Sequence, residues 1–320
     1  MSESQKRTIA RYQGFFEALS LSASLEAALD IGILEALREG QMDLAELARR
    51  CRCDPEPLGA LVRVLLAVGA LELYGDDLAL SQATQLLAGP DVDLGRGVWQ
   101  DLPDFLSGEQ RSTGSLESYR ERIIARQWSH TAAAMQAAEV LEIGSGLRGL
   151  KLLELGSGTG VWSAAMAYRD PGLQVTAVDD AVRLPQCHAT YASVDLLSRL
   201  TLIDDDYRTW STPLGEFDLV ILPQVLQLEQ DIDAVILLGR AADALRVGGQ
   251  VVILETLRES DGPELTLATS ALEIAVATGG QQRSAGEMQR LLRGAGFGDA
   301  KWGWLTASNH GIGLVIASKE

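Results

Sequence analysis

Histidine and cysteine are scarce in this sequence, with three of each among 320 residues. Cys51 and Cys53 form a C-x-C pair that has no second pair and no histidine nearby, which argues against a zinc site. An odd number of cysteines in a chain without a secretion signal fits reduced thiols. We therefore expect neither a metal centre nor a disulfide framework.

Long apolar runs and an excess of positive charge are also missing. Hydrophobic residues make up 47% of the chain, yet no run of ~18 of them could span a bilayer. The opening residues, MSESQKRTIARYQ, have no apolar stretch of the kind that a secretion signal needs, so we expect a cytoplasmic protein. The net charge of −17 repels nucleic-acid phosphates and anionic membranes, and we expect neither as a partner.

The first hundred residues predict helices followed by a β-hairpin. Apolar residues recur at helical spacing over 15–40, and Asp43 can cap a short helix after it. A further helix is predicted over 57–70, and 71–80 alternates around a Gly-Asp-Asp turn, which is a hairpin signal. This order is that of a winged helix-turn-helix.

The helix predicted over 57–70 decides between two functions of such a module. It carries one basic residue, Arg63, among leucines and valines, whereas a helix that enters a DNA groove needs several basic or polar side chains. We therefore interpret the N-terminal module as a dimerisation and substrate-covering element.

The next segment, 91–126, is predicted to be a looser connector that contains several glycines and aromatic residues. Those aromatics either wall a pocket or pack the seam between domains. We divide the chain into a helical domain over 1–98, linker and substrate-covering helices over 99–135, and a cofactor-binding domain over 136–320.

After residue 150, strands alternate with helices. The strand-like runs are 151–155, 173–179, 199–203, 217–222 and 250–255. A helix is predicted over 231–247, ending at two glycines, and a closing hairpin is predicted around 309–311. Alternating βα units imply an α/β fold, with a parallel sheet covered by helices on both faces and an antiparallel pair at its edge.

Two near-copies of one phrase, VLEIGSG and LLELGSG, begin at Val140 and Leu152. The second is followed by a helix and by a strand that ends at Asp179, 21 residues after Gly158, which is the spacing at which an acid reaches a ribose. The first leaves no room for a crossover helix before the next strand. We interpret it as the end of a helix that stops at Gly144.

The surrounding motifs are more specific than the glycines. E-x-G-x-G-x-G, the acid after the second strand and Asp205 after the third resemble the class I S-adenosylmethionine-dependent methyltransferases. Within these, the sequence resembles the small-molecule O-methyltransferase family that includes caffeate-type, acetylserotonin-type and bacterial polyketide enzymes. The segments that carry this resemblance are 202–207, 217–227, 244–255 and 278–297. With the winged N-terminal part, it covers roughly residues 12 to 318.

The resemblance implies a Rossmann-like seven-stranded methyltransferase domain preceded by a mostly helical winged-helix dimerisation domain. It implies S-adenosylmethionine as cofactor, a natural-product-like small molecule as substrate, and a homodimer formed through the N-terminal domain.

The resemblance also implies roles for individual residues. The glycine loop would line the methionine and ribose portion of the cofactor through Gly156, Ser157, Gly158 and Gly160. Asp179 would hold the ribose hydroxyls, and Asp205 with Tyr207 would flank the adenine. Glu154 would help to place the methionine end.

The sequence departs from the family pattern at the catalytic position. Most members have a histidine in a V-L-H-D-W-like phrase, which acts as the base for the substrate hydroxyl, but here the phrase is V-L-Q-L-E. Gln227 stands at the histidine position and Leu228 at the aspartate position, and Gln282 replaces the glutamate that can orient the histidine. Glutamine cannot accept a proton at neutral pH, and the loss of the His-Asp pair also argues against a metal.

Other groups could act instead. His130 could face the pocket as a base, and Glu229 or Asp231 could do the same unless they only cap the following helix. The residues that we expect to contact the substrate are Trp128, Met135 and Gln224.

Three functions remain open. In the first, the protein methylates an acceptor that reacts without a general base, such as an acidic phenol, an amine or a stabilised carbanion. Alignment of the methyl donor with the acceptor then supplies most of the rate. Alternatively, it uses bound S-adenosylmethionine without methyl transfer, for hydroxylation, pericyclic chemistry or breakdown of the cofactor. The third function is that of a non-enzymatic scaffold, against which the intact glycine loop argues. We favour methyl transfer.

Overall fold

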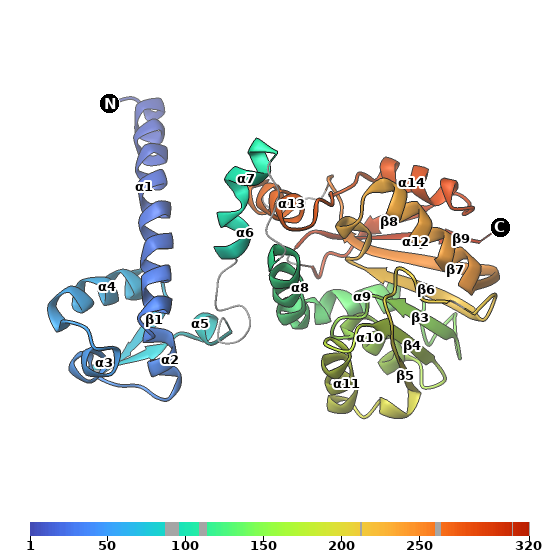
Figure 1. The fold of residues 1–320 in the computed structure, drawn as a ribbon, viewed down its shortest axis with the longest axis horizontal. Helices are drawn as coiled ribbons and strands as arrows, with labels where there is room; N and C mark the ends of the chain where they lie inside the picture. The colour runs from blue at the N-terminus through green and yellow to red at the C-terminus, as the bar shows by residue number, and fades with distance from the viewer. Residues whose placement is uncertain (87–95, 109–113, 212, 260–263, 309, 320) are drawn as a thin grey trace. The chain divides into compact units, whose positions relative to one another are not determined.

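The computed structural model describes residues 1–86, 96–108, 114–211, 213–259, 264–308 and 310–319. The chain divides into two compact units, Met1–Arg96 and Gly97–Glu320, whose elements are labelled in Figure 1. The domain bounds predicted at 98 and 135 lie within helices, and that division of the chain stays a prediction. Within the described ranges, no helix combines the length and the apolar character that crossing a membrane requires.

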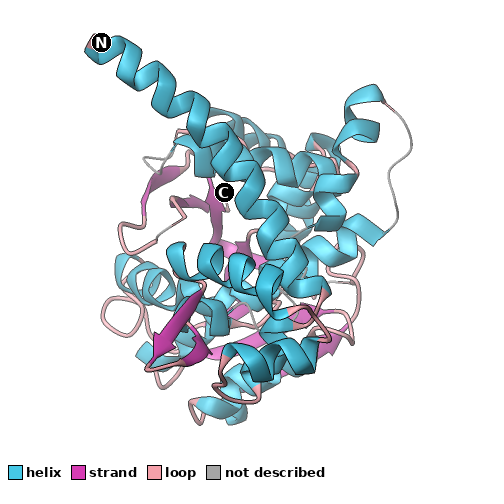
Figure 2. Ribbon diagram, turned by 90° about the vertical axis from the view of Figure 1, so that its left-hand side faces the viewer, coloured by secondary structure: helices cyan, strands magenta, loops and turns pink. Residues whose placement is uncertain are grey.

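The N-terminal unit consists of helices and one hairpin, as the cyan and magenta segments in Figure 2 show. Its elements are α1 (Glu3–Asp30), α2 (Ile33–Arg38), α3 (Leu44–Cys51), α4 (Pro55–Ala67), β1 (Leu71–Tyr74), β2 (Asp77–Leu80) and α5 (Gln82–Leu86). Asp43 caps α3 through a hydrogen bond from the N–H of Glu46, and β1 pairs antiparallel with β2. The predicted cap and hairpin are therefore confirmed, and one apolar core joins the helices to the hairpin.

Two predicted helix bounds in this unit are wrong. The helix expected over 15–40 begins at Glu3 and breaks after Asp30, because Gly32 has a φ of 78°, a left-handed conformation that ends one helix and starts the next. The helix expected over 57–70 is α4, which begins earlier because Asp54 caps it with prolines in its first turn.

The second unit contains the predicted sheet. Its seven strands are β3 (Lys151–Leu155), β4 (Gln174–Asp179), β5 (Leu200–Asp204), β6 (Phe217–Pro223), β7 (Leu245–Thr256), β8 (Lys301–Trp304) and β9 (Ile312–Ser318). They lie in the order β5-β4-β3-β6-β7-β9-β8. The first five pair in parallel, and β9 runs antiparallel between β7 and β8. This confirms a mostly parallel seven-stranded sheet with an antiparallel edge; Asn309 of the closing turn lies outside the described residues.

Helices cover both faces of this sheet (Figure 1). On one face lie α9 (Thr131–Val140), α10 (Val161–Arg169) and α11 (Leu184–Ser193), and on the other lie α12 (Asp231–Ala244) and α14 (Ala285–Gly294). Successive strand residues alternate between the two cores: Leu152 packs in the first and Leu153 in the second. Both strand faces are thus buried, as the near-continuous apolar runs of the sequence require.

The segment that was expected to be a loose connector is largely helical where it is described. It forms α6 (Arg96–Gln100), α7 (Leu102–Ser107), α8 (Gly114–Arg126) and the 3-10 turn η2 (Gln127–His130). Tyr119 of α8 packs in a small apolar cluster with Val98 and with Ile274 of α13 (Glu264–Thr278). Tertiary packing of these helices outweighs the local glycine signals.

The first glycine phrase does not form a strand, as predicted, but the helix before it ends earlier than expected. α9 stops at Val140, and Glu142 and Gly144 both adopt positive φ values, of 55° and 81°. The N–H of Gly144 donates to the carbonyl of Leu147 at 2.7 Å, and a side chain at Gly144 would collide with the carbonyl of Arg169. VLEIGSG is thus a tight loop packed against the end of α10.

The helix predicted over 231–247 also ends early. α12 stops at Ala244, and Leu245 already pairs with Phe217 as the first residue of β7. Gly248, with a φ of 77°, lies within β7, near a shift in its register with β6. The two glycines therefore accommodate an irregularity in a strand and do not end a helix.

Candidate active site

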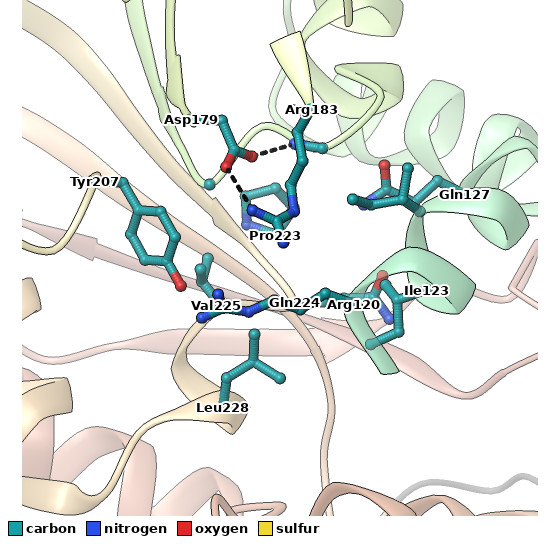
Figure 3. Close-up of a pocket in the computed structure, with 13 residues that line it drawn as sticks. Arg120, Ile123, Gln127, Asp179, Arg183, Tyr207, Pro223, Gln224, Val225 and Leu228 are labelled. Carbon is teal, nitrogen blue, oxygen red and sulfur yellow. Dashed lines mark hydrogen bonds and ion pairs between the residues drawn. The ribbon is translucent and has the colours of Figure 1, made fainter. Parts of the chain in front are cut away.

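A pocket lies at the carboxyl ends of β3, β4 and β6, where the strand order reverses between β3 and β6. It has a volume of about 440 Å³. Its walls are the glycine loop after β3, Asp179 at the end of β4, Tyr207 after β5 and the segment 223–225. Figure 3 shows these side chains around one space. We call it the first pocket; ligands of open α/β sheets bind at this reversal of strand order.

The glycine loop brings bare backbone to this pocket. Gly156 and Gly158 have φ values of 72° and 53°. A Cβ atom at Gly156 would come within 2.7 Å of Val225, and one at Gly158 within 2.7 Å of the Gln127 amide. Gly160 does not line the pocket; it begins α10, and a Cβ there would be 2.5 Å from the sulfur of Cys187. The loop therefore requires glycine both for conformation and for space.

Asp179 is the acid of this pocket and is only 3% exposed. One carboxylate oxygen accepts the N–H of Gly158 at 2.8 Å, and the other lies 3.9 Å from the guanidinium of Arg183. Burial raises the pKa of this carboxyl, while the Gly158 N–H and Arg183 oppose the rise. The 21-residue spacing thus places the acid directly beneath the glycine loop.

Gln127 and Arg183 line the pocket although neither belongs to a sequence motif. Gln127 of η2 covers the loop, because its Oε1 accepts both the N–H and the hydroxyl of Thr159 at 2.7 Å. Arg183 donates two hydrogen bonds to Glu117 of α8, at 2.8 and 2.9 Å. Both contacts fasten the α8–η2 segment over the pocket, and both depend on tertiary structure rather than on local spacing.

Of the two residues expected at the adenine, only Tyr207 lines the pocket. It is 8% exposed, and its hydroxyl has no hydrogen-bond partner within the described ranges. Burial raises its pKa to about 12. Asp205 is exposed, and its carboxylate accepts the N–H of Asp206. The structure therefore does not bring Asp205 into the first pocket.

Glu154 and Ser157 lie behind the loop rather than in the pocket. Glu154 is fully buried on β3, where it accepts a hydrogen bond from the hydroxyl of Ser163, which in turn accepts one from Tyr191 at 2.8 Å. Burial raises the pKa of Glu154 to about 8, against the opposing effect of the Ser163 hydrogen bonds. Ser157 is 1% exposed and lies near Cys187. Both residues support the loop from beneath.

A second pocket adjoins the first and has a volume of about 680 Å³. Gln224 and Ile123 line both pockets. The side chains with polar groups that line the second pocket are Tyr119, Arg122, Arg126, His130, Gln224, Gln227, Thr256, Thr266, Ser270, Glu273 and His310. Two ligands bound in the two pockets would therefore meet at Gln224.

Gln224 and Gln227 are held firmly by their main chains. Gln224 has a φ of 59°, and its N–H donates to the carbonyl of Leu254 at 2.9 Å. The N–H of Gln227 donates to the carboxylate of Glu255 at 2.8 Å, and its carbonyl accepts the N–H of Gln281 at 2.9 Å. Among the described residues, the Oε1 atoms of both side chains are buried without a hydrogen-bond partner.

His130 also faces the second pocket, 5% exposed. Its ring stacks on Trp162 with centroids 5.7 Å apart and lies edge-on to His310 at 5.2 Å. Burial, together with His310, lowers the pKa of His130 to about 4. The ring is neutral at physiological pH and is a weak base.

Two of the residues expected to contact the substrate line neither pocket. Trp128 is 55% exposed and lines neither pocket. Met135 packs against the core between α9 and the sheet. The alternative bases Glu229 and Asp231 also lie outside both pockets, and Asp231 is paired with Arg283 at 3.0 Å.

Comparison with known proteins identifies the family. A family model for an O-methyltransferase domain matches residues 115–298, more than half of the chain. The chain belongs to the O-methyltransferase family. Its members use S-adenosylmethionine as the methyl donor.

Individual relatives match most of the chain. The chain is 32% identical to an acetylserotonin O-methyltransferase from Macaca mulatta over 87% of this chain and 89% of that protein. It is 28% identical to aclacinomycin 10-hydroxylase RdmB from Streptomyces purpurascens over 86% of this chain and 80% of that protein. The structure of human N-acetylserotonin methyltransferase in complex with S-adenosylmethionine superposes with a TM-score of 0.70 over 100% and 99% of the two chains, at 22% identity, and this likeness shows the fold.

The first pocket fits the cofactor of this O-methyltransferase family. Gly156 and Gly158 bring backbone without side chains to the pocket, Asp179 offers a carboxylate for ribose hydroxyls, and the Tyr207 hydroxyl stands without a partner among the described residues. When bound, the cofactor supplies an electrophilic methyl group on a sulfonium. Asp179, Tyr207 and the backbone of Gly156 and Gly158 would hold it in the first pocket, which shares Gln224 with the second pocket.

We predict that Asp179→Asn lowers the affinity for S-adenosylhomocysteine about 10- to 100-fold, because a hydrogen bond to a charged carboxylate is lost while the amide can still accept the Gly158 N–H. Isothermal titration calorimetry on the full chain measures this. Asp195→Asn, an exposed change beyond α11, is the control. Equal affinities for wild type and Asp179→Asn would contradict the assignment.

Glu154 predicts a pH dependence of stability. Its pKa is 4.5 in the unfolded chain and about 8 when buried, so between these values the unfolded chain releases a proton that the folded chain keeps. The free energy of unfolding therefore falls as pH rises from about 4.5 to 8. Glu154→Gln should make this fall less steep in urea titrations at several pH values, whereas exposed Glu139→Gln should not. Identical slopes for Glu154→Gln and wild type would refute the buried protonated state.

Proposed function

We propose that this protein transfers the methyl group of S-adenosylmethionine to a small, natural-product-like molecule in the second pocket, without a protein base at position 227. The observation that carries this proposal is the shared wall: Gln224 borders both pockets. An acceptor in the second pocket would therefore lie next to a methyl donor in the first pocket, beside Gln224. Holding donor and acceptor in line supplies most of the rate of such a displacement.

The side chain of Gln227 supports the second half of the proposal. It lines the second pocket but its amide cannot take a proton. His130 is neutral, and with a pKa of about 4 it is a poor match for a general base at neutral pH. The acceptor must therefore react without prior deprotonation by these residues, which favours a nucleophile with an available lone pair or an acidic proton.

A second candidate function uses the cofactor without methyl transfer. The relative named as a 10-hydroxylase, 28% identical over most of both chains, favours it. The two candidates differ in the fate of the cofactor. Candidate phenols, amines and β-dicarbonyls are incubated with the chain and S-adenosylmethionine, and the products are identified by mass spectrometry. A methylated acceptor together with released S-adenosylhomocysteine supports methyl transfer. An acceptor that is consumed while S-adenosylmethionine stays intact supports the second function. Failure of either cofactor form to bind would remove both.

We predict that Gln227→His raises the methylation of a phenol such as 1-naphthol by at least about tenfold, because a positioned general base typically contributes more than this. The rate of S-adenosylhomocysteine release measures the gain. Gln186→His, on the exposed face of α11, should leave the rate unchanged. An unchanged rate in folded Gln227→His would show that position 227 does not face the acceptor.

We also propose a homodimer formed through the N-terminal unit, with no nucleic acid as partner. One stretch of α1 exposes a series of large apolar side chains: Ile9, Tyr12, Phe15, Phe16 and Leu19, each between 44% and 75% exposed. A solvent-facing apolar surface of this extent marks an interaction site. Helix α4, which would be the DNA-recognition helix of a winged helix-turn-helix, has Arg63 as its single basic residue. This argues against nucleic acid as a partner.

The paired change Phe15→Glu and Leu19→Glu should convert the dimer into a monomer in light scattering after size exclusion, because it places charges in the apolar surface. Leu73→Glu, which alters another exposed leucine, on β1, should leave the dimer intact. A monomeric wild-type chain would contradict this proposal.

A further inference from the structure

The lining of the second pocket contains two hydrogen-bond acceptors that nothing described in the protein uses. The Oε1 atoms of Gln224 and Gln227 are both buried without a partner in the described part of the chain. Buried carbonyl oxygens are nearly always hydrogen-bonded, so an unsatisfied pair in a pocket wall indicates a ligand that donates. The requirement here is for two donors, because there are two oxygens.

These side chains cannot satisfy themselves by small main-chain movements. The N–H groups of both residues are engaged, with the carbonyl of Leu254 and with the carboxylate of Glu255. Gln227 is further fixed through its own carbonyl, which accepts from Gln281, and a Cβ at Gly280 would collide with that carbonyl. The β6–η4 segment (η4, Leu226–Leu228) is thus a rigid platform that presents two amides to the second pocket.

We propose, on the basis of the proposed function, that the acceptor atom is the nitrogen of a neutral primary aromatic amine. Such a nitrogen carries two N–H donors, one for each glutamine carbonyl, and keeps a lone pair for the methyl group. A hydroxyl carries a single O–H and leaves one oxygen unsatisfied.

An amine acceptor also explains why the site needs no general base. The nitrogen lone pair forms the new N–C bond while the bond between sulfur and the methyl carbon breaks, and the sulfonium becomes a neutral thioether. The nitrogen then carries a positive charge and its protons, one of which leaves to solvent after transfer. Two carbonyl dipoles directed at this nitrogen stabilise the charge as it develops, and no residue has to remove a proton beforehand.

The charges around the second pocket favour a neutral amine over an ammonium ion. Two arginines, Arg122 and Arg126, line this pocket. Among its described lining residues, Glu273 is the acidic one, and it forms an ion pair with Arg122. An ammonium group would meet these guanidinium groups and would have no lone pair. Aromatic amines are weak bases and are uncharged at neutral pH, so they satisfy both requirements.

The test compares 1-aminonaphthalene with 1-naphthol, which share a ring and differ in the donor group. The full chain loaded with S-adenosylhomocysteine is titrated with each in a calorimeter, and the chain supplied with S-adenosylmethionine is assayed for methylated product by mass spectrometry. We expect tighter binding and faster methylation of the amine. We expect Gln224→Met and Gln227→Met each to weaken amine binding about tenfold, while exposed Gln186→Met does not.

The outcomes separate this inference from the proposed function. Equal or better binding and methylation of 1-naphthol in the wild-type chain would overturn the inference and leave methyl transfer standing. Absence of binding of both probes would also overturn it, and retained S-adenosylmethionine affinity would show that the cofactor site survives. The melting temperature of each methionine variant shows whether it is folded. If a variant is unfolded, the comparison of 1-aminonaphthalene with 1-naphthol in the wild-type chain still decides whether the acceptor is an amine.

Discussion

The hydrogen bond from the N–H of Gly158 to the carboxylate of Asp179, 2.8 Å long, is the contact on which the site depends. It joins the loop after β3 to the end of β4, and so fixes the left-handed turn of the loop against the strand that carries the acid. Gln127 then closes over the loop, and Arg183 ties α8 to the same corner through Glu117. Removing the conformational freedom of glycine here would disturb the acid, the helix above it and the pocket between them.

The parts of the site that follow local rules could be predicted from the sequence. β3 was predicted to the residue, and the acid at the end of β4 was found from its distance to Gly158, because a βαβ unit has a narrow range of lengths. Asp205 does not line the pocket, because side chains beyond a strand end point in directions that spacing does not specify. Tyr207, two residues later, has the burial that the role needs.

The parts that depend on tertiary packing could not be predicted. Glycines suggested a loose connector where α8 forms, because the packing of Tyr119 against α13 has no local signature. Gln127 belongs to no motif, yet its amide caps the loop 32 residues away. Trp128 was expected in the pocket from its aromatic character, but the adjacent residue on η2 faces inward and turns the tryptophan to solvent. Hydrophobic pattern and spacing thus specify the sheet and the cradle, and three-dimensional contacts specify the cover.

The two glutamines connect this architecture to the chemistry. A residue other than glycine at a φ of 59° is a strained conformation, and such strain persists where the surrounding structure or the function requires it. Gln224 adopts it where the two pockets meet. The most direct test is a crystal structure of the full chain with S-adenosylhomocysteine. The account predicts ribose hydroxyls within hydrogen-bond distance of Asp179 and the sulfur facing Gln224; a ligand bound elsewhere, or with its sulfur turned from Gln224, would contradict it.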